Sequence, residues 1–507
     1  MRRIRQLSRS AVVFGICLLT SCTVGPKYHP PVSQAPSAYK EAPGNFKESG
    51  PWTVAQPADA KIRGDWWAIF NDPELNALES QLNINNQTLK QYFENFMEAR
   101  AVIREARSSY FPTVSVGPSY TRTKSPSGAL GVSSSGVAIS SSSRGSTSFY
   151  TLPGDVSWAP DLWGRVRNQV HEAQYAAQIS AADLENERLT EQADLAAYFF
   201  EIHGQDALIK LYAETVAADQ KTLDLTKALY ETGIDDRISV VEAQNTLQAA
   251  EAAETNLGIL RAQYEHAVAV LIGKPPEEFS IPVRPITAAP PPIPIGMPSL
   301  LLQRRPDIAA AERSMAEANA AIGIAYAAYY PSLTISGDFG TEGSVLKQLA
   351  EWSSRFWSVG GSISETVYEG GLRRATVNQY IATYNADLAS YRQTVLTAFQ
   401  QVEDYLAQVR ILSRQIVQEQ QVVASAQEAL SLELNRYKTG IDPYIDVVTL
   451  QMTVLGDQTT LVTLQIDEMT GAVELVEALG GGWDRSQLPS PAQVTAKPAV
   501  TDTKIQQ

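Results

Sequence analysis

Apolar residues recur at steps of three, four and seven along two long stretches of this chain. The first series is Leu195, Phe199, Ile202, Ile209, Val216, Leu223 and Tyr230. The second is Val402, Leu406, Val409, Ile416, Val423, Leu430 and Tyr437, and each member follows its counterpart by 207 positions. Such steps keep one seam of a helix apolar, as in coiled coils. The pattern therefore predicts two long helices that pack along equivalent seams.

A short motif repeats with the same offset, which predicts two structural repeats in one chain. Tyr-Glu-Thr-Gly-Ile-Asp at 230–235 recurs as Tyr-Lys-Thr-Gly-Ile-Asp at 437–442. Gly233 and Gly440 are expected to adopt a left-handed C-cap conformation and reverse the chain, so that a return helix follows each turn. The 65 residues before each motif would span about 100 Å if helical throughout. Rods of this length exceed what a globular core needs.

Segments in which polar and apolar residues alternate precede each long helix. They are Thr113–Arg122, Ser148–Trp158, Ser332–Phe339 and Arg355–Val367. Period-two alternation predicts two β-hairpins, and each follows a predicted helical run, at 66–110 and from about 306 to 330. Ser- and Gly-rich residues 125–147 are expected to form a solvated loop. Four strands cannot close a barrel in lipid, so either several chains pool their strands or the hairpins belong to a soluble domain.

Residues 1–21 have the features of a lipoprotein signal peptide: four arginines, a short apolar run and Leu-Thr-Ser before Cys22. The apolar run is too short to span a bilayer. The Cys22 thiol is expected to take a diacylglyceryl group after cleavage; a signal anchor with an incidental cysteine is the alternative. Cleavage would remove Cys17, so the mature chain would keep one cysteine and could form no internal disulfide. Thr23 follows the cysteine, which favours lipid anchoring to the outer membrane.

The remaining segments complete the domain organisation. Residues 22–60 are rich in proline and serine and are predicted to form an extended strap. Residues 61–272 and 299–482 are the two repeats, each with a helix, a β-hairpin and long helices. Spaced prolines over 273–298 favour an extended linker, and 483–507 are predicted to be a disordered tail. The fold class is therefore mainly α with a β portion.

Charge and chemistry exclude several functions. The formal net charge is −14, and it becomes −18 when the four signal-peptide arginines are removed, so nucleic-acid binding is not expected. The four histidines have no metal-ligand spacing, and no nucleophile motif or phosphate-binding glycine loop stands out. We therefore expect no enzyme activity, no cofactor and no metal site.

Several motifs occur in a fixed order along the chain. They are Val24-Gly25-Pro26, Trp66-Trp67 with Phe70, Asp161-Leu162-Trp163-Gly164, the Pro298 to Glu312 segment and the doubled Tyr-x-x-Gly turn. In this order they resemble the outer membrane factors of tripartite efflux systems, the TolC-like channels, in the NodT-type lipoprotein branch. The resemblance implies a homotrimer whose twelve strands form one outer-membrane β-barrel, continued by a long α-helical coiled-coil tunnel through the periplasm. It also implies N-palmitoyl and S-diacylglycerol groups on Cys22.

The resemblance also implies a function and partners. The chain would be an outer-membrane exit duct for small molecules, working with a periplasmic adaptor (membrane fusion) protein and an inner-membrane pump of the RND type. The family's periplasmic gate lies at the Tyr-x-x-Gly turns, where Tyr437 matches the gating tyrosine and Asp446 matches a lumen-facing aspartate. Asp442 stands near the place of a family arginine. For both aspartates the alternative is a stabilising charge at a helix N-terminus; for the chain, it is a lipid-anchored coiled-coil structural or secretion scaffold without a pore.

Overall fold

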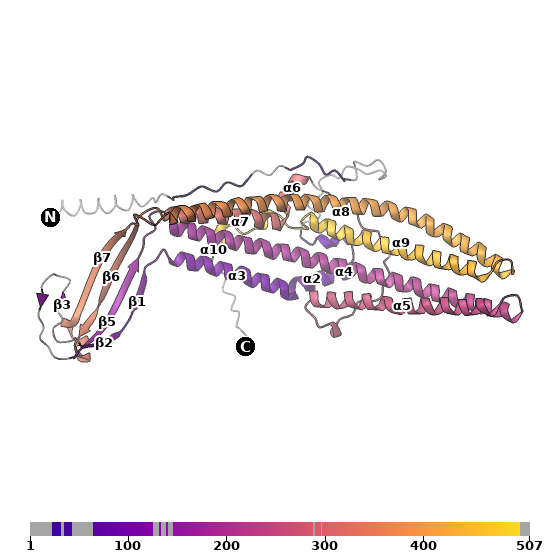
Figure 1. Cartoon of the computed structure of the whole chain (residues 1–507), viewed down its shortest axis with the longest axis horizontal. Coiled ribbons are helices and arrows are strands. Elements are labelled where there is room, and N and C mark those ends of the chain that lie inside the picture. The colour runs from indigo at the N-terminus through magenta and orange to yellow at the C-terminus, as the bar shows by residue number, and fades with distance from the viewer. Residues whose placement is uncertain are drawn as a thin grey trace.

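The computed structural model describes residues 23–31, 35–42, 64–124, 131–132, 138–139, 146–286, 289–295 and 297–496. The molecule is an elongated rod with a β-sheet at one end and two helical hairpin tips at the other (Figure 1). The signal peptide and Cys22 lie outside the described residues. Most of 125–147, the predicted loop, also lies outside them; within it the structure describes the paired two-residue strands β3 (Gly131–Val132) and β4 (Ala138–Ile139).

The long helices confirm the predicted repeat. Helices α4 (Arg165–Glu231) and α8 (Leu372–Lys438) are each 67 residues long, and the return helices α5 (Arg237–Leu271) and α9 (Tyr444–Ala478) are each 35. Gly233 and Gly440 have φ angles of 76° and 72°, in the left-handed region that glycine adopts without steric cost. Both glycines therefore terminate and reverse their helices as the sequence predicts.

The two predicted hairpins are present and join into one sheet. Strands β1 (Thr113–Val116) and β2 (Ser119–Lys124) both pair antiparallel with β5 (Ser146–Trp158). Strands β6 (Ser332–Gly343) and β7 (Arg355–Ser364) form the second hairpin. Pairing of β5 with β6 joins them in the order β1-β5-β6-β7, so β1 and β7 form the edges.

Alternation gives this sheet one apolar and one polar face. The register aligns Phe339 with Trp357, Gly337 with Val359 and Leu333 with Ile363. Successive side chains point to opposite faces, so these residues share one face, and Ser358 and Asp338 share the other. Trp357 and Ile363 are 79% and 75% exposed. Such a sheet cannot bury its apolar face within this chain, and the pattern is the one that transmembrane barrels present to lipid.

The middle of the rod carries the two largest apolar cores. One core packs η3 (Trp66–Phe70) and α2 (Pro73–Asn85) against α4, α5 and α9 around Trp66, Phe199 and Val473. The other packs Tyr39 of the N-terminal strap and helices α6 (Pro298–Arg304) and α7 (Pro306–Ala327) against α8 and α9. The predicted seam is buried through this region and along most of its length. It fails at Tyr230, which is 46% exposed, whereas its counterpart Tyr437 is 2% exposed.

The single helical run predicted from Trp66 to Tyr110 is wrong, because the chain breaks at Asn86 between α2 and α3 (Gln87–Ser108). The side-chain Oδ1 of Asn86 accepts from the Leu89 N–H, which caps α3, and the side-chain Nδ2 donates to Glu191 and to the Leu271 carbonyl. Asparagine at such an N-cap satisfies a free backbone donor. The break therefore docks the start of α3 on α4 and on the end of α5.

The predicted disorder of residues 483–507 is wrong as far as Ala496. Segments η7 (Arg485–Gln487) and α10 (Pro491–Thr495) are ordered, and Val494 is buried against Ile103, Ala173 and Ala177. Arg100 donates to the carbonyls of Val494 and Ala496. One apolar side chain and these backbone contacts hold a segment whose composition alone does not predict packing. Residues 497–507 lie outside the described part of the chain.

A buried ion network joins the linker after α5 to the core. Asp206 of α4 accepts from Arg261 Nε at 2.6 Å and from the backbone N–H of Arg284 at 2.8 Å. Burial opposes ionisation, but hydrogen bonds from His203, Arg284 and Arg261 outweigh it and lower the pKa of Asp206.

Short 3-10 segments complete the described fold: η4 (Pro276–Glu278), η5 (Leu346–Ala350) and η6 (Trp352–Ser354).

The buried seam can be tested at Val423, which is buried in α8. Val423→Asp would place an uncompensated charge against packed side chains, so we expect it to destabilise the folded protein by several kcal/mol, about 2 to 5. Thermal unfolding of the purified protein would measure the loss. Ser425→Asp, at an exposed position of the same helix, is the matched control. Equal stability of the two variants would mean that the seam has been assigned to the wrong face.

Candidate functional site

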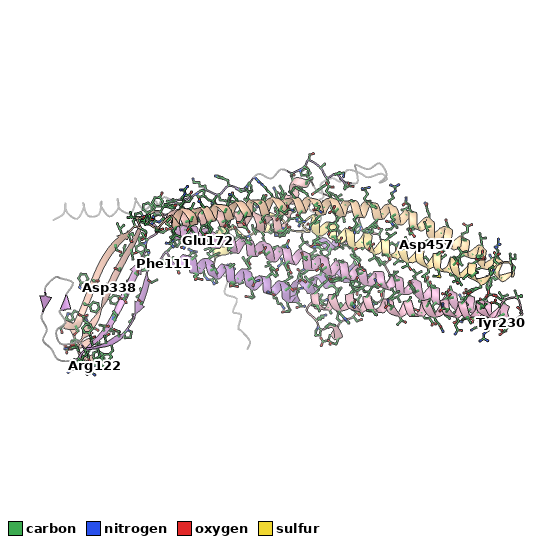
Figure 2. All side chains as sticks on the ribbon, viewed as in Figure 1. Phe111, Arg122, Glu172, Tyr230, Asp338 and Asp457 are labelled. Carbon is green, nitrogen blue, oxygen red and sulfur yellow. The ribbon has the colours of Figure 1, made fainter. Side chains whose placement is uncertain are left out.

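The two hairpin tips at the end of the rod form the candidate site. They consist of the α4–α5 turn around Gly233 and the α8–α9 turn around Gly440, at the end opposite the sheet (Figure 1). Figure 2 places Tyr230 at this tip and Arg122 in the sheet at the other end. Gly440 approaches Ile234 of the first turn, and a Cβ on Gly440 would lie 3.1 Å from Ile234 Cγ2. The turns of the two repeats therefore touch each other within one chain.

Tyr437 joins the two tips. Its hydroxyl lies 2.6 Å from Asp235 Oδ2, to which it donates, and 3.0 Å from Thr226 Oγ1. Its ring packs at 5.5 Å from the ring of Tyr444, inside an apolar cluster with Leu223 and Val447. Burial, followed by the hydrogen bond to Asp235, raises the pKa of Tyr437 above its ordinary value. The phenol therefore stays neutral and bridges the second repeat to the first.

Asp442 closes its own turn. Its two carboxylate oxygens contact Arg436 Nε and a terminal guanidinium nitrogen, the latter at 2.9 Å. The hydrogen bond from Arg436 is the main cause that lowers the pKa of Asp442. Glu433 also lies beside Asp442, and burial followed by a hydrogen bond between the Glu433 and Asp442 side chains raises the pKa of Glu433. The negative charge of Asp442 is thus compensated within the α8–α9 turn.

Asp446 lies one turn further along, near the N-terminus of α9. It is exposed, and among the described residues no cation forms an ion pair with it. Its counterpart in the first repeat, Ser239, is buried and donates to Asp235 at 2.7 Å. The structure therefore separates the two predicted aspartates, because Asp442 is paired and Asp446 keeps a free carboxylate.

Sequence reasoning missed Asp235 and Thr226 as the partners of Tyr437. Asp235 is the last residue of the doubled motif and occupies the position that Asp442 occupies in the second copy. The repeat itself therefore pointed to Asp235, but it did not indicate which copy of the motif is buried. Only the packing shows that one tyrosine is buried against the other repeat and that the other tyrosine faces outward.

Exposed apolar side chains surround the tips. Ile234 and Ile238 on the first hairpin, and Ile441 and Ile445 on the second, are each more than half exposed. Exposed apolar residues that cluster at the end of a rod are typical of a surface that binds another protein.

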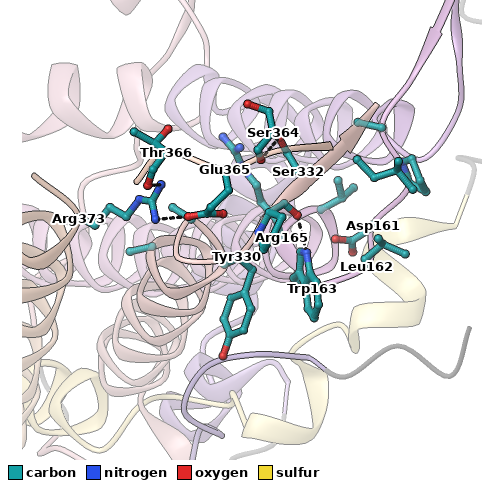
Figure 3. Close-up of a pocket in the computed structure, with 18 of the residues that line it drawn as sticks. Asp161, Leu162, Trp163, Arg165, Tyr330, Ser332, Ser364, Glu365, Thr366 and Arg373 are labelled. Atoms are coloured by element: carbon teal, nitrogen blue, oxygen red, sulfur yellow. Dashed lines mark hydrogen bonds and ion pairs between the residues drawn. The ribbon is translucent and has the colours of Figure 1, made fainter. Parts of the chain in front are cut away.

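A separate cavity of about 430 Å³ lies where the sheet meets the helices. The Trp163 indole donates to the Pro331 carbonyl at 2.7 Å and stacks on Tyr330, and Arg373 pairs with Glu365 at 2.6 Å (Figure 3). Trp163 belongs to the Asp-Leu-Trp-Gly motif of the sequence. These contacts fix the direction of the strands relative to α4 and α8. The residues around the cavity therefore connect the sheet to the helices.

Two further kinds of feature are absent from the described part of the chain. It contains no group of three or more His, Cys, Asp or Glu side chains that could hold a metal ion. None of its helices combines the length and the apolar character that a membrane span requires.

Comparison with known proteins identifies the family. Residues 78–274 and 297–481 match the family model described as outer membrane efflux protein. The chain is 28% identical over 468 residues to the probable efflux pump outer membrane protein TtgC of Pseudomonas putida, which covers 92% of this chain and 94% of that protein. It is 26% identical over 459 residues to nodulation protein T of Rhizobium leguminosarum bv. trifolii, with 90% and 93% coverage.

A solved relative agrees in three dimensions. The outer-membrane channel OprN superposes with a TM-score of 0.79 at 27% sequence identity, over 91% of this chain and all of that chain. The predicted fold class, a trimeric outer-membrane channel with a strand portion and a long helical portion, is confirmed, as are the outer-membrane location and the channel function. The chain belongs to the outer membrane efflux protein family.

Proposed function

We propose that three copies of this chain form a passive exit duct for small molecules, which is closed at the helical tips and opened by a periplasmic adaptor protein. An inner-membrane pump, of the RND class as the resemblance implies, would supply the energy. The observation that carries the proposal is the five-stranded sheet, which has β1 and β2 along one edge, β7 along the other, and an exposed apolar face. Three such sheets joined edge to edge would pair the backbone groups of both edges and form a closed barrel. The apolar face of each sheet would then face lipid and not water.

The division into repeats 61–272 and 299–482 is part of this proposal. A lipid-anchored scaffold without a pore, the alternative raised from the sequence, leaves the apolar face of the sheet unexplained. Ion conductance of the purified protein in planar bilayers distinguishes the two: the duct conducts as a trimer, and the scaffold does not.

The adaptor would bind at the tips. Ile234, Ile238, Ile441 and Ile445 provide the exposed apolar surface there, and binding between the hairpins could compete with the Tyr437 contact. The link between Tyr437 and Asp235 would then be the closing contact of the gate, because it is a short hydrogen bond to a carboxylate that joins one repeat to the other at the tips.

The lipid anchor fits the position of the strap. Thr23 packs on Gly164, and a Cβ on Gly164 would lie 3.1 Å from the Cα of Thr23. The Val24 N–H donates to the Trp163 carbonyl. Gly25 lies against the backbone of Gly323 in the same way. These contacts start the strap at the joint between sheet and helices, which in an outer-membrane channel is the periplasmic membrane surface. A lipid on Cys22 would enter the inner leaflet there.

The anchor is predicted to assist the barrel and not to replace it. Cys22→Ala, expressed behind a cleavable signal of a non-lipoprotein, should remain in the outer-membrane fraction with reduced yield, because the sheets still insert. Membrane fractionation and native gels would measure location and oligomeric state. A soluble periplasmic monomer would contradict the barrel assignment.

Loss of the Tyr437 hydroxyl is predicted to open the gate at rest. Tyr437→Phe keeps the ring but removes a hydrogen bond to a charged group, worth about 1.5 to 3 kcal/mol, so resting conductance should rise roughly tenfold or more. Tyr230→Phe, the same change at the exposed counterpart, is the control and should conduct like the wild type. Indistinguishable conductance of all three proteins would remove Tyr437 from the gate.

The free carboxylate of Asp446 is predicted to attract cations to the closed tip. A threefold axis would gather three copies, and like charges so placed favour bound cations. Asp446→Asn should weaken block of single-channel current by a multivalent cation added on the periplasmic side. Asp442→Asn should affect block less, because Arg436 already compensates that charge. Equal block in the wild type and both variants would exclude these aspartates.

A further inference from the structure

A polar stripe interrupts the packing between the two hairpins, above the tips. Asp219, Thr222 and Thr226 follow one face of α4 at spacings of three and four, and all three are buried. Thr226 contacts Tyr437, and Thr222 and Asp219 contact Gln451 of α9. The stripe therefore continues the Tyr437 contact along the seam between the repeats.

Asp219 is the charged member of this stripe. Asp219 is 5% exposed, and Gln451 Nε2 donates to Asp219 Oδ1 at 3.0 Å. Within the described chain no lysine, arginine or histidine lies within ion-pair distance of it. The Oε1 atom of Gln451 is also buried and has no donor. One carboxylate without a cation thus faces one amide oxygen without a donor.

A proton would complete this pair. The protonated carboxyl group would gain an O–H that can donate to Gln451 Oε1 while Gln451 Nε2 still donates to the other carboxyl oxygen. The ionised form lacks that second hydrogen bond and leaves a charge out of water. Burial raises the pKa of Asp219 to about 6, so the two forms exchange at pH values near neutrality.

The surrounding groups provide no competing charge of opposite sign. Tyr444 of α9 faces the same region, and burial followed by the charge of Asp219 raises its pKa to about 12. Glu242 of α5 acts on Tyr444 in the same direction. From α8, the neutral phenol of Tyr437 lies further along the stripe and is bound to Asp235. Asp219 is therefore the group in this cluster that titrates close to neutral pH.

The pair exists on one side of the repeat only. Gln244, the counterpart of Gln451, is exposed, and the position equivalent to Asp219 in the second repeat is Ala426. Packing of the seam does not require a carboxylate at this position, since the second copy of the helix packs without one.

We propose that Asp219 and Gln451 form a proton-binding pair that holds α4 against α9, so that acidification of the periplasm keeps the duct closed. The inference rests on the proposed gate, whose opening separates the two hairpins and admits water to Asp219.

The direction of the effect follows from linkage. Hydration would return the pKa of Asp219 from about 6 towards its ordinary value of 3.8, so opening releases a proton. The proton therefore stabilises the closed state fully below pH 3.8, and this stabilisation is lost as the pH rises through 6. Between pH 7 and pH 5 the ratio of closed to open states should rise about tenfold for each protomer.

Single-channel recording of the full-length protein tests the pair. Wild-type open probability should fall at least about tenfold from pH 7 to pH 5, and the fall should begin near pH 6. Asp219→Asn, a neutral mimic of the protonated residue, should have low open probability at both pH values. Asp224→Asn, which removes an exposed carboxylate of the same helix, is the matched control and should follow the wild type. An unchanged pH profile in Asp219→Asn would overturn the proposal.

A second readout does not depend on conduction. Spin labels at exposed Lys221 of α4 and Met452 of α9 should report a shorter, narrower distance distribution at pH 5 than at pH 7.5, and Asp219→Asn should abolish the difference. If the Tyr437→Phe channel conducts but neither readout depends on Asp219, the proton-binding pair is wrong and the duct stands. If no protein conducts at any pH, the proposed duct is wrong, and the label distances alone decide on the pair.

Discussion

Burial of one apolar seam on each long helix is the interaction on which the rest of the structure depends. Helices of 67 residues cannot be stabilised by propensity alone, and most of their stability must come from packing. Around the middle of the rod, η3, α2, α5, α6, α7 and α9 provide that packing. The sheet at one end and the tips at the other are then held at fixed positions by helices that extend from this core.

The character of the packing changes along the rod. In the middle, large apolar side chains and the Asp206 ion network leave little freedom, and the strap and the ordered part of the C-terminal segment add further contacts. Towards the tips, the contacts between repeats become a small apolar cluster and a polar stripe that ends in Tyr437. Water can replace hydrogen bonds between polar groups, whereas it offers nothing to exposed apolar cores, so separation of the distal hairpins in the proposed gate would cost less than separation of the middle. A duct that must stay assembled and still open needs this difference.

The two repeats share length and turn geometry but not chemistry. Tyr437 is buried where Tyr230 is exposed, Gln451 is engaged where Gln244 faces outward, and Asp446 stands where the first repeat has Ser239. Because the helices of the two repeats have equal lengths, both hairpins extend equally far along the rod. Unequal side chains give the two hairpins different contacts at the tips, and the proposed gate depends on that difference.

The long helices, the strands, the reversing glycines and the twofold repeat could all be predicted from the amino-acid sequence. These features follow from local periodicity and backbone preference, which need no knowledge of the fold. The family resemblance also placed a gate at the two tip turns, which stays a prediction. It could not distinguish Asp442 from Asp446, because pairing with Arg436 depends on how the turn closes. Nor could it find Asp235 opposite Tyr437, the break at Asn86 or the ordered Val494, since each depends on contacts between residues far apart in the chain. Burial decides which copy of a repeated residue acts, and burial is set only when the two repeats pack against each other.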